Sequence, residues 1–135
     1  MVNGVVQRKL ALLDNQVEKL KNHFSPLSFE EFKDSWEHRS IAERGLQVAV
    51  EICIDIAERI IALKEAGPVA GAGEAMEKLE SLGIINAAEP YRSMVRFRNL
   101  IVHEYEQMDP EILYKLVTRN LMDFRKFRDE LDKSL

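Results

Sequence analysis

The chain has 135 residues, of which 46% are hydrophobic and 31% charged. This composition excludes an intrinsically disordered chain and a membrane protein, and the length predicts a single domain over residues 1–135. The 19 Lys and Arg residues are outnumbered by 23 Asp and Glu, which gives a formal net charge of −4. That balance excludes a nucleic-acid binder that relies on a polycationic tail, but it leaves room for a local basic site.

The cysteine count and the apolar stretches bear on the cellular compartment in which the protein is expected. Cys53 is the only cysteine, so neither an intrachain disulfide nor a cysteine zinc cluster can form. Charges at Arg8, Lys9 and Asp14 interrupt any signal peptide, and charged residues also interrupt the longest apolar stretch, at 46–63. We therefore expect a cytoplasmic protein without a membrane span.

The first segment repeats an apolar residue every three or four positions, which is typical of one face of an amphipathic helix. Its apolar positions are Val6, Leu10, Leu13, Val17 and Leu20. Ser25-Pro26 breaks this helix, and the sequence Ser28 to Glu31 is typical of a capping box that opens a short helix.

The segment from Glu37 to Ala66 contains no proline and keeps a helical period throughout. It predicts one helix of about 30 residues, roughly 45 Å long, which ends at Gly67-Pro68. Its polar residues fall within about 60° of one another on a helical projection. These residues are Ser40, Arg44, Gln47, Glu51, Asp55 and Glu58.

A surface helix is normally apolar on one stripe, whereas this helix is polar on one stripe only. We therefore expect it to be buried on more than one side, and the extra apolar surface suggests a second protomer. The alternative is a central helix with a narrow solvated edge. Glu51 and Asp55 either line a cleft between protomers or pair with Arg44 or Arg59.

The second half of the chain predicts further helices and no strand. A short helix from Glu74 to Leu82 closes on Gly83, and another begins at Asn86 to Pro90 and runs to about His103. A further helix is predicted to begin here, with Asp109 as its N-cap and Pro110 as its first helical residue.

The last helix carries its apolar residues on one side and could run nearly to the end of the chain. These residues are Leu113, Val117, Leu121, Phe124, Phe127 and Leu131. The predicted fold is an all-α, up-and-down, four-helix-type bundle with an additional short helix.

Several kinds of site are missing from the sequence. No glycine-rich phosphate loop is followed by Lys-Ser or Lys-Thr, and no Glu-x-x-His pair of a di-iron bundle occurs. The histidines His23, His38 and His103 are not spaced as metal ligands. We therefore predict no metal and no cofactor.

The segment 91–103 holds three arginines and no acidic residue, although the whole chain is acidic. Arg92, Arg96, Asn99 and His103 fall on one helical stripe, and Arg98 projects from a different side. Arginine grips phosphate or carboxylate with two parallel hydrogen bonds, so the segment predicts an anion-binding site.

His103 adds a group that can transfer a proton near neutral pH. Attack of a 2′-hydroxyl on its own phosphodiester needs a proton acceptor, a proton donor and a cation, which His and Arg can supply without metal. The alternative from the residues alone is a structural histidine, with the arginines solvated or paired with Glu89, Glu104 or Glu106.

At these residues the chain resembles the HepT toxins, a branch of the HEPN superfamily. The sequence from Arg98 through His103 to Tyr105 matches their Arg-x4-His-x-Tyr motif, and Asn99 fits the polar position after the arginine. The segments 46–57 and 82–85 also resemble the family's long helix and its lead-in to the motif helix.

The resemblance implies an all-α homodimer with a composite cleft that acts as a metal-independent RNA endoribonuclease toxin. It implies that His103 transfers the proton, Arg98 holds the phosphate and Asn99 supports the site. It further implies a minimal nucleotidyltransferase antitoxin, of the MNT type, that adenylylates Tyr105. The added bulk and negative charge would exclude RNA from the site.

Other roles follow less directly. Arg92 and Arg96 extend a possible phosphate track but are not motif positions. The expected substrate is single-stranded or looped RNA, whose bases are accessible. The alternative functions are a non-catalytic helical module that binds a nucleotide or partners a nucleotidyltransferase, and a purely structural dimerisation bundle.

Overall fold

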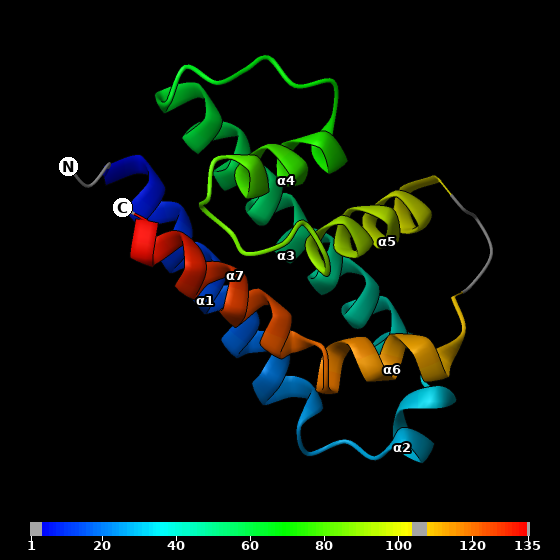
Figure 1. Ribbon diagram of the computed structural model, residues 1–135. Coiled ribbons are helices and arrows are strands. Elements are labelled where there is room, and N and C mark those ends of the chain that lie inside the picture. The colour runs from blue at the N-terminus through cyan, green and yellow to red at the C-terminus, as the bar shows by residue number, and fades with distance from the viewer. Residues whose placement is uncertain (1–3, 104–107, 135) are drawn as a thin grey trace.

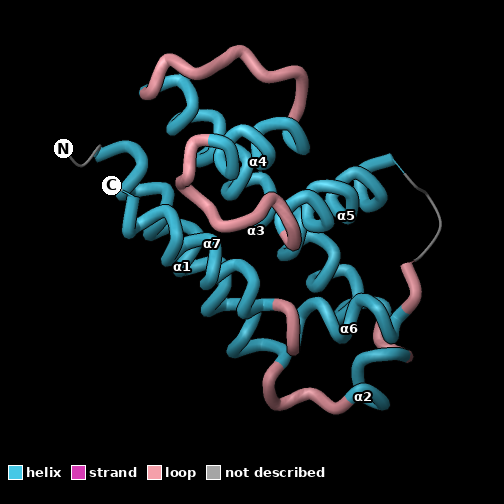
Figure 2. Tube along the Cα trace, in the orientation of Figure 1, coloured by secondary structure: helices cyan, strands magenta, loops and turns pink. Residues whose placement is uncertain are grey.

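The computed structural model describes residues 4–103 and 108–134 of the chain. Over these residues the chain forms helices and no strand (Figures 1 and 2). The helices are α1 (Gly4–Phe24), α2 (Phe29–Lys33), α3 (Trp36–Leu63), α4 (Ala72–Ser81), α5 (Tyr91–His103), α6 (Pro110–Thr118) and α7 (Leu121–Ser134). The prediction of an all-α bundle is confirmed.

The first two helices form as their sequence predicts. In α1 the five predicted apolar residues are all buried, together with Phe24 at its end. The capping box before α2 is complete, because the Ser28 hydroxyl accepts from the Glu31 N–H at 3.1 Å and the Glu31 carboxylate accepts from the Ser28 N–H at 3.0 Å. These contacts satisfy two N–H groups that the start of a helix leaves without partners.

The long central helix α3 begins after an N-cap at Ser35 and ends at Leu63, three residues earlier than its periodicity predicts. Glu65 adopts a left-handed conformation with φ of 53°. The Glu65 N–H donates to the Ala62 carbonyl, and the Ala66 N–H donates to the Ile61 carbonyl. This is a Schellman motif, which ends a helix before the Gly-Pro pair is reached.

The burial of α3 on several sides is confirmed, since eleven of its 28 residues are buried. The other helices of the described chain all pack against it, and Figure 1 shows it in the middle of the bundle. Most of the apolar surface that suggested a second protomer is therefore covered by helices of the same chain. It does not by itself require a dimer.

The link into α5 is longer than predicted, because α5 begins at Tyr91 and not at Asn86. Gly83 takes a left-handed conformation, with φ of 74°, that ends α4 as expected. The following N–H groups bind carboxylates: Asn86 donates to Glu130 at 3.0 Å and Ala88 donates to Glu80 at 2.6 Å. These contacts give the N–H groups of the link hydrogen-bond partners outside a helix.

The last predicted helix is two helices, so its expected continuity is wrong. Asp109 caps α6 through the N–H of Glu111, but α6 ends at Thr118 and α7 starts at Leu121. The Thr118 hydroxyl donates to the Tyr114 carbonyl at 2.7 Å, a contact that bends helices. The bend leaves the predicted apolar residues of both helices buried.

Candidate functional site

Helix α5, which carries the arginine segment, is anchored to α7 at its first residue. The buried Tyr91 hydroxyl donates to the Glu130 carboxylate. Burial is the main cause that raises the pKa of Tyr91, and the contact with Glu130 adds to it, so the phenol stays neutral. The anchor sets the rotation of α5, and hence the directions in which its arginines point.

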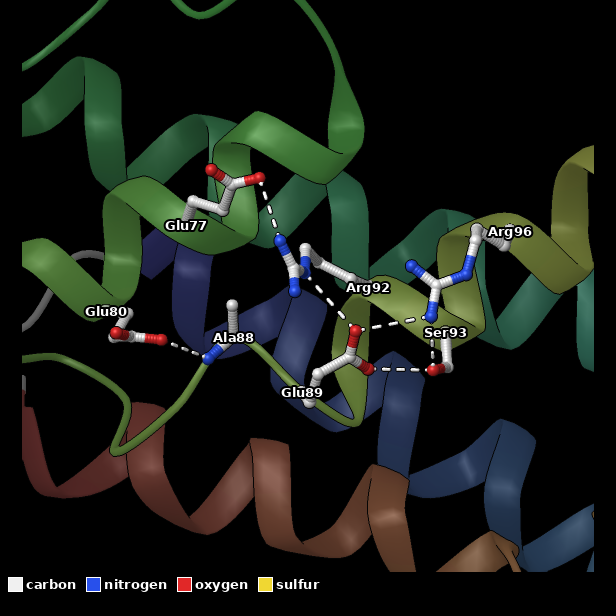
Figure 3. Close-up of polar contacts among 7 residues, drawn as sticks. All are labelled: Glu77, Glu80, Ala88, Glu89, Arg92, Ser93 and Arg96. Atoms are coloured by element: carbon white, nitrogen blue, oxygen red, sulfur yellow. Dashed lines mark hydrogen bonds and ion pairs between the residues drawn. The ribbon is translucent and has the colours of Figure 1, made fainter.

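The first two arginines of α5 are paired with acids (Figure 3). Arg92 lies 3.2 Å from a Glu77 carboxylate oxygen on α4 and 3.3 Å from Glu89. Arg96 lies 3.2 Å from the same Glu89 oxygen and donates to the Ser93 hydroxyl at 2.8 Å. Contact of either guanidinium with RNA would require it to exchange a carboxylate partner.

Glu89 is the centre of this cluster. The Ser93 hydroxyl donates to its second carboxylate oxygen at 2.7 Å, and this bond is the first cause that lowers the pKa of Glu89. The Arg96 and Arg92 charges lower it further. Glu89 therefore stays ionised and offsets positive charge at the start of α5.

Arg98 lies in a different environment. Its side chain is half-buried, and its Nε atom is buried without a hydrogen-bond partner among the described residues. It lines a hollow of about 520 Å³, which we call the α3–α5 groove. The other lining residues belong to α3: Arg44, Val48, Glu51, Ile52, Ile54, Asp55 and Glu58.

The polar stripe of α3 thus forms one wall of this groove, and its acids have partners other than those predicted. Glu51 accepts from Gln47 at 3.0 Å, and Asp55 pairs with Lys9 of α1. Lys9 lies 46 positions away in the sequence, so local spacing gave no signal for it. The groove brings together carboxylates, apolar side chains and the guanidinium groups of Arg44 and Arg98, neither of which has an acidic partner among the described residues.

The remaining motif residues extend from Arg98 towards the end of α5. Asn99 is exposed, and His103 is the last residue of the helix. The described part of the chain does not include the His103 side chain, and Tyr105 lies outside it. The roles of Arg98, Asn99, His103 and Tyr105 remain predictions.

The other two histidines contact each other and not the arginine segment. His23 Nε2 lies 3.1 Å from His38 Nδ1 where the end of α1 meets the start of α3. Across residues 4–103 and 108–134, no three His, Cys, Asp or Glu side chains gather as a metal-binding group. None of the helices described is long and apolar enough to cross a membrane.

The fold and the groove define a helical bundle in which Arg98 of α5 lines a cleft against a polar stripe on the central helix. The profile of the family described as "Ribonuclease HepT-like" matches residues 13–131. The chain therefore belongs to the HepT-like ribonuclease family. The resemblance seen in the motif is confirmed, as is the prediction of an enzyme of the ribonuclease class.

Two characterised relatives are similar over nearly their full lengths. The mRNA nuclease HepT of Shewanella oneidensis is 25% identical over 130 residues, covering 95% of this chain and 96% of that protein. The tRNA nuclease HepT of Aphanizomenon flos-aquae is 25% identical over 133 residues, covering 97% of this chain and 90% of that protein.

The same fold occurs in a solved complex. The tri-AMPylated HEPN toxin of Shewanella oneidensis, in complex with its MNT antitoxin, superposes with a TM-score of 0.89 at 24% identity. The match covers 98% of this chain and 99% of that one. The shared fold covers α1 to α7, including the arginine helix.

Proposed function

We propose that this chain is the toxin of a HEPN/MNT toxin–antitoxin pair and that it cleaves RNA internally without a metal ion. Arg98 binds the scissile phosphate, His103 transfers the proton, and Asn99 supports them. The family match and the names of the two nuclease relatives support RNA as the substrate. The whole chain, residues 1–135, acts as one domain in this proposal.

The reaction is an intramolecular phosphoryl transfer. The 2′-oxygen of a ribose attacks the adjacent phosphorus as its proton passes to a base, and the bond from phosphorus to the 5′-oxygen breaks. The leaving 5′-oxygen takes up a proton, so the products carry a 2′,3′-cyclic phosphate and a 5′-hydroxyl. A guanidinium stabilises the negative charge that grows on the phosphoryl oxygens, and a histidine carries the proton.

The observation that carries the proposal is the position of Arg98, which lines the α3–α5 groove and has no acidic partner among the described residues. Its Nε atom is covered by the protein and has no hydrogen-bond partner there, so the Nη atoms are the part of the guanidinium that a phosphate would meet. Arg92 and Arg96 already have carboxylate partners, which distinguishes Arg98 from its neighbours.

The working unit in this proposal is a homodimer whose α3–α5 grooves face each other. The wall of the groove includes the half-buried Val48 and Ile52. At the end of α5, Leu100 and Val102 are 48% and 46% exposed, which is high for large apolar side chains. A second copy placed here would cover them and bring a second Arg98 to a shared cleft.

Regulation follows from the position of Tyr105 in the motif. We propose that an MNT-type nucleotidyltransferase transfers AMP to its hydroxyl, with pyrophosphate leaving when ATP is the donor. Each AMP adds negative charge beside a site that must accept RNA phosphate. Intact mass of the protein with and without the partner tests this step, and no mass gain that maps to Tyr105 contradicts it.

The direct test of the function uses purified protein, a single-stranded RNA and an excess of chelator. We expect cleavage that leaves 2′,3′-cyclic phosphate ends, and loss of at least about 100-fold in rate for His103→Ala. Full activity of His103→Ala, purified identically, would refute the assigned role. Calorimetric binding of nucleotides without any cleavage would favour a non-catalytic module instead.

A further inference from the structure

A second hollow lies against α5 on the face next to Arg98. It has a volume of about 240 Å³ and opens between α3, α5 and the junction of α6 with α7. Its walls are mainly apolar, with Met94 and Phe97 from α5 and the buried Leu46 and Phe124 behind them. We call it the α5–α7 pocket.

One end of the α5–α7 pocket is polar. Asn120 and Asp123 line it, and the Asn120 Nδ2 atom donates to the Asp123 carboxylate at 3.3 Å. This contact leaves the Asn120 Oδ1 atom buried and without a hydrogen-bond partner among the described residues. The Asn120 Oδ1 atom is itself covered by the protein, so the polar end presents the Asp123 carboxylate, and a ligand that completes it must bring N–H donors.

We propose that the α5–α7 pocket binds a guanine base of the RNA substrate, an inference that rests on the proposed function. Apolar and aromatic walls with a few polar groups at one end are how proteins hold a single extruded base. The Watson–Crick edge of guanine carries two neighbouring donors, N1–H and the N2 amine. Both can donate to the Asp123 carboxylate, which lines the pocket.

The other bases fit these acceptors less well. Adenine and cytosine each place an unprotonated ring nitrogen beside their amine, and uracil places its N–H between two carbonyls. Each of these lone pairs would face the Asp123 carboxylate. Among the described residues, no Lys, Arg or His lines the pocket, so the base, and not the phosphate, is the part of a nucleotide that enters.

The α5–α7 pocket and the groove lined by Arg98 lie on neighbouring faces of α5. Phe97 and Arg98 are consecutive residues of α5, so their side chains leave the helix about 100° apart at the same level. Phe97 lines the α5–α7 pocket and Arg98 lines the α3–α5 groove. One nucleotide can thus place its base in the pocket and its phosphate towards Arg98.

The test compares two nucleotides that differ at one group. GMP and IMP are titrated into the purified protein and binding is followed by NMR or calorimetry, because IMP lacks only the N2 amine. We expect GMP to bind at least about fivefold more tightly, the usual effect of a hydrogen-bonded base edge. Equal affinities for GMP and IMP, or tighter binding of AMP, would overturn the assignment.

Matched variants locate the binding site. Asp123→Asn turns one acceptor into a donor and is expected to remove the preference for GMP, whereas Asp129→Asn, on the exposed side of α7, keeps it. Met94→Trp places a larger side chain at the pocket wall and is expected to weaken GMP binding. Unchanged GMP binding by folded Met94→Trp overturns the proposal.

The readout separates this inference from the proposed function. Arg98→Ala is expected to keep the ratio of GMP to IMP affinity even where cleavage is lost. A wild-type protein that cleaves no RNA contradicts the proposed function. Nucleotide binding requires no cleavage, so the GMP and IMP affinities still test whether the pocket binds guanine.

Discussion

At the scale of single residues, the site is defined by which arginine lacks an acidic partner. Arg92, Arg96 and Arg98 are equivalent in charge and share one helix, yet Glu77 and Glu89 engage only the first two. Surface ion pairs of this kind contribute little to stability, but they hold the guanidinium groups in fixed positions. Arg98 instead lines the α3–α5 groove, where we propose that it binds a phosphate.

Gly45 allows α1 and α3 to pack closely, and its replacement gives a test of that packing. A Cβ atom at Gly45 would overlap the Leu20 side chain, which is buried. Overpacking costs about 1–3 kcal/mol, while alanine gains about 1 kcal/mol of helix propensity over glycine. We expect Gly45→Ala to lower the free energy of unfolding by about 1 kcal/mol, measured by urea denaturation.

Gly73→Ala in α4 is the matched control, because a Cβ atom there meets nothing within 4 Å. It is expected to raise the free energy of unfolding by up to about 1 kcal/mol. A Gly45→Ala protein as stable as Gly73→Ala would show that α1 and α3 are not in close contact at this point.

The sequence predicted some side-chain partners of the site and missed others. It identified Glu89 as a partner for the arginines because the two lie within one or two helical turns. It missed Lys9 as the partner of Asp55 and Glu130 as the acceptor for Tyr91, since these pairs join distant parts of the chain. The α5–α7 pocket was missed because its lining residues come from helices that are distant in the sequence.

At the scale of elements, capping residues and turn residues close in the sequence determine where most of the helices begin or end. The capping box at Ser28, the left-handed Gly83 and the Asp109 cap all function as their residue types predict. The start of α5 was misjudged because its lead-in is held by carboxylates from α4 and α7. The break between α6 and α7 was missed because their apolar periodicity continues through it.

The cluster around Glu89 makes part of the stability pH-dependent. The pKa of Glu89 is lower in the folded chain, so its contribution is present above the ordinary glutamate pKa of about 4.3 and is lost as pH falls through the lower folded value. We expect wild type to be more stable than Glu89→Gln at pH 7. The difference should shrink as the pH falls below about 4.3.

Urea denaturation of both proteins across that pH range measures the effect. A stability difference that stays constant down to acid pH would contradict the role given to the carboxylate.

At the scale of the whole molecule, most of α3 is covered by helices of its own chain, and the argument for a dimer rests on the face that carries the α3–α5 groove. Leu100→Glu and Val102→Glu introduce charge on the exposed end of α5. We expect each to shift the proposed dimer to monomer, because a buried unpaired carboxylate strongly disfavours association. Light scattering coupled to size exclusion reports the mass.

Leu12→Glu is the control for this experiment, since Leu12 on α1 is 56% exposed and lies outside the groove. It is expected to leave the mass of the wild type unchanged. A monomeric wild type, or Leu100→Glu and Val102→Glu variants with unaltered mass, would exclude this face as the interface.

The helical class of the fold was predictable because periodicity and caps are local properties of the sequence. Its family followed from the spacing of Arg98, His103 and Tyr105. The arrangement of the groove was not predictable, because it depends on the rotation of α5 against α3. That rotation is set by the contact of Tyr91 with Glu130, 39 positions away.

The central claim, that Arg98 is the arginine that acts on RNA, is tested most directly by a pair of variants of the same helix. Cleavage of one RNA in chelator is compared for wild type, Arg98→Ala and Arg96→Ala, with thermal unfolding to confirm that all three fold. The proposed role predicts that the cleavage rate falls about 100-fold or more in Arg98→Ala. It predicts a fall of less than about tenfold in Arg96→Ala, because Arg96 is paired with Glu89. Equal losses for the two variants, or an active Arg98→Ala, would contradict it.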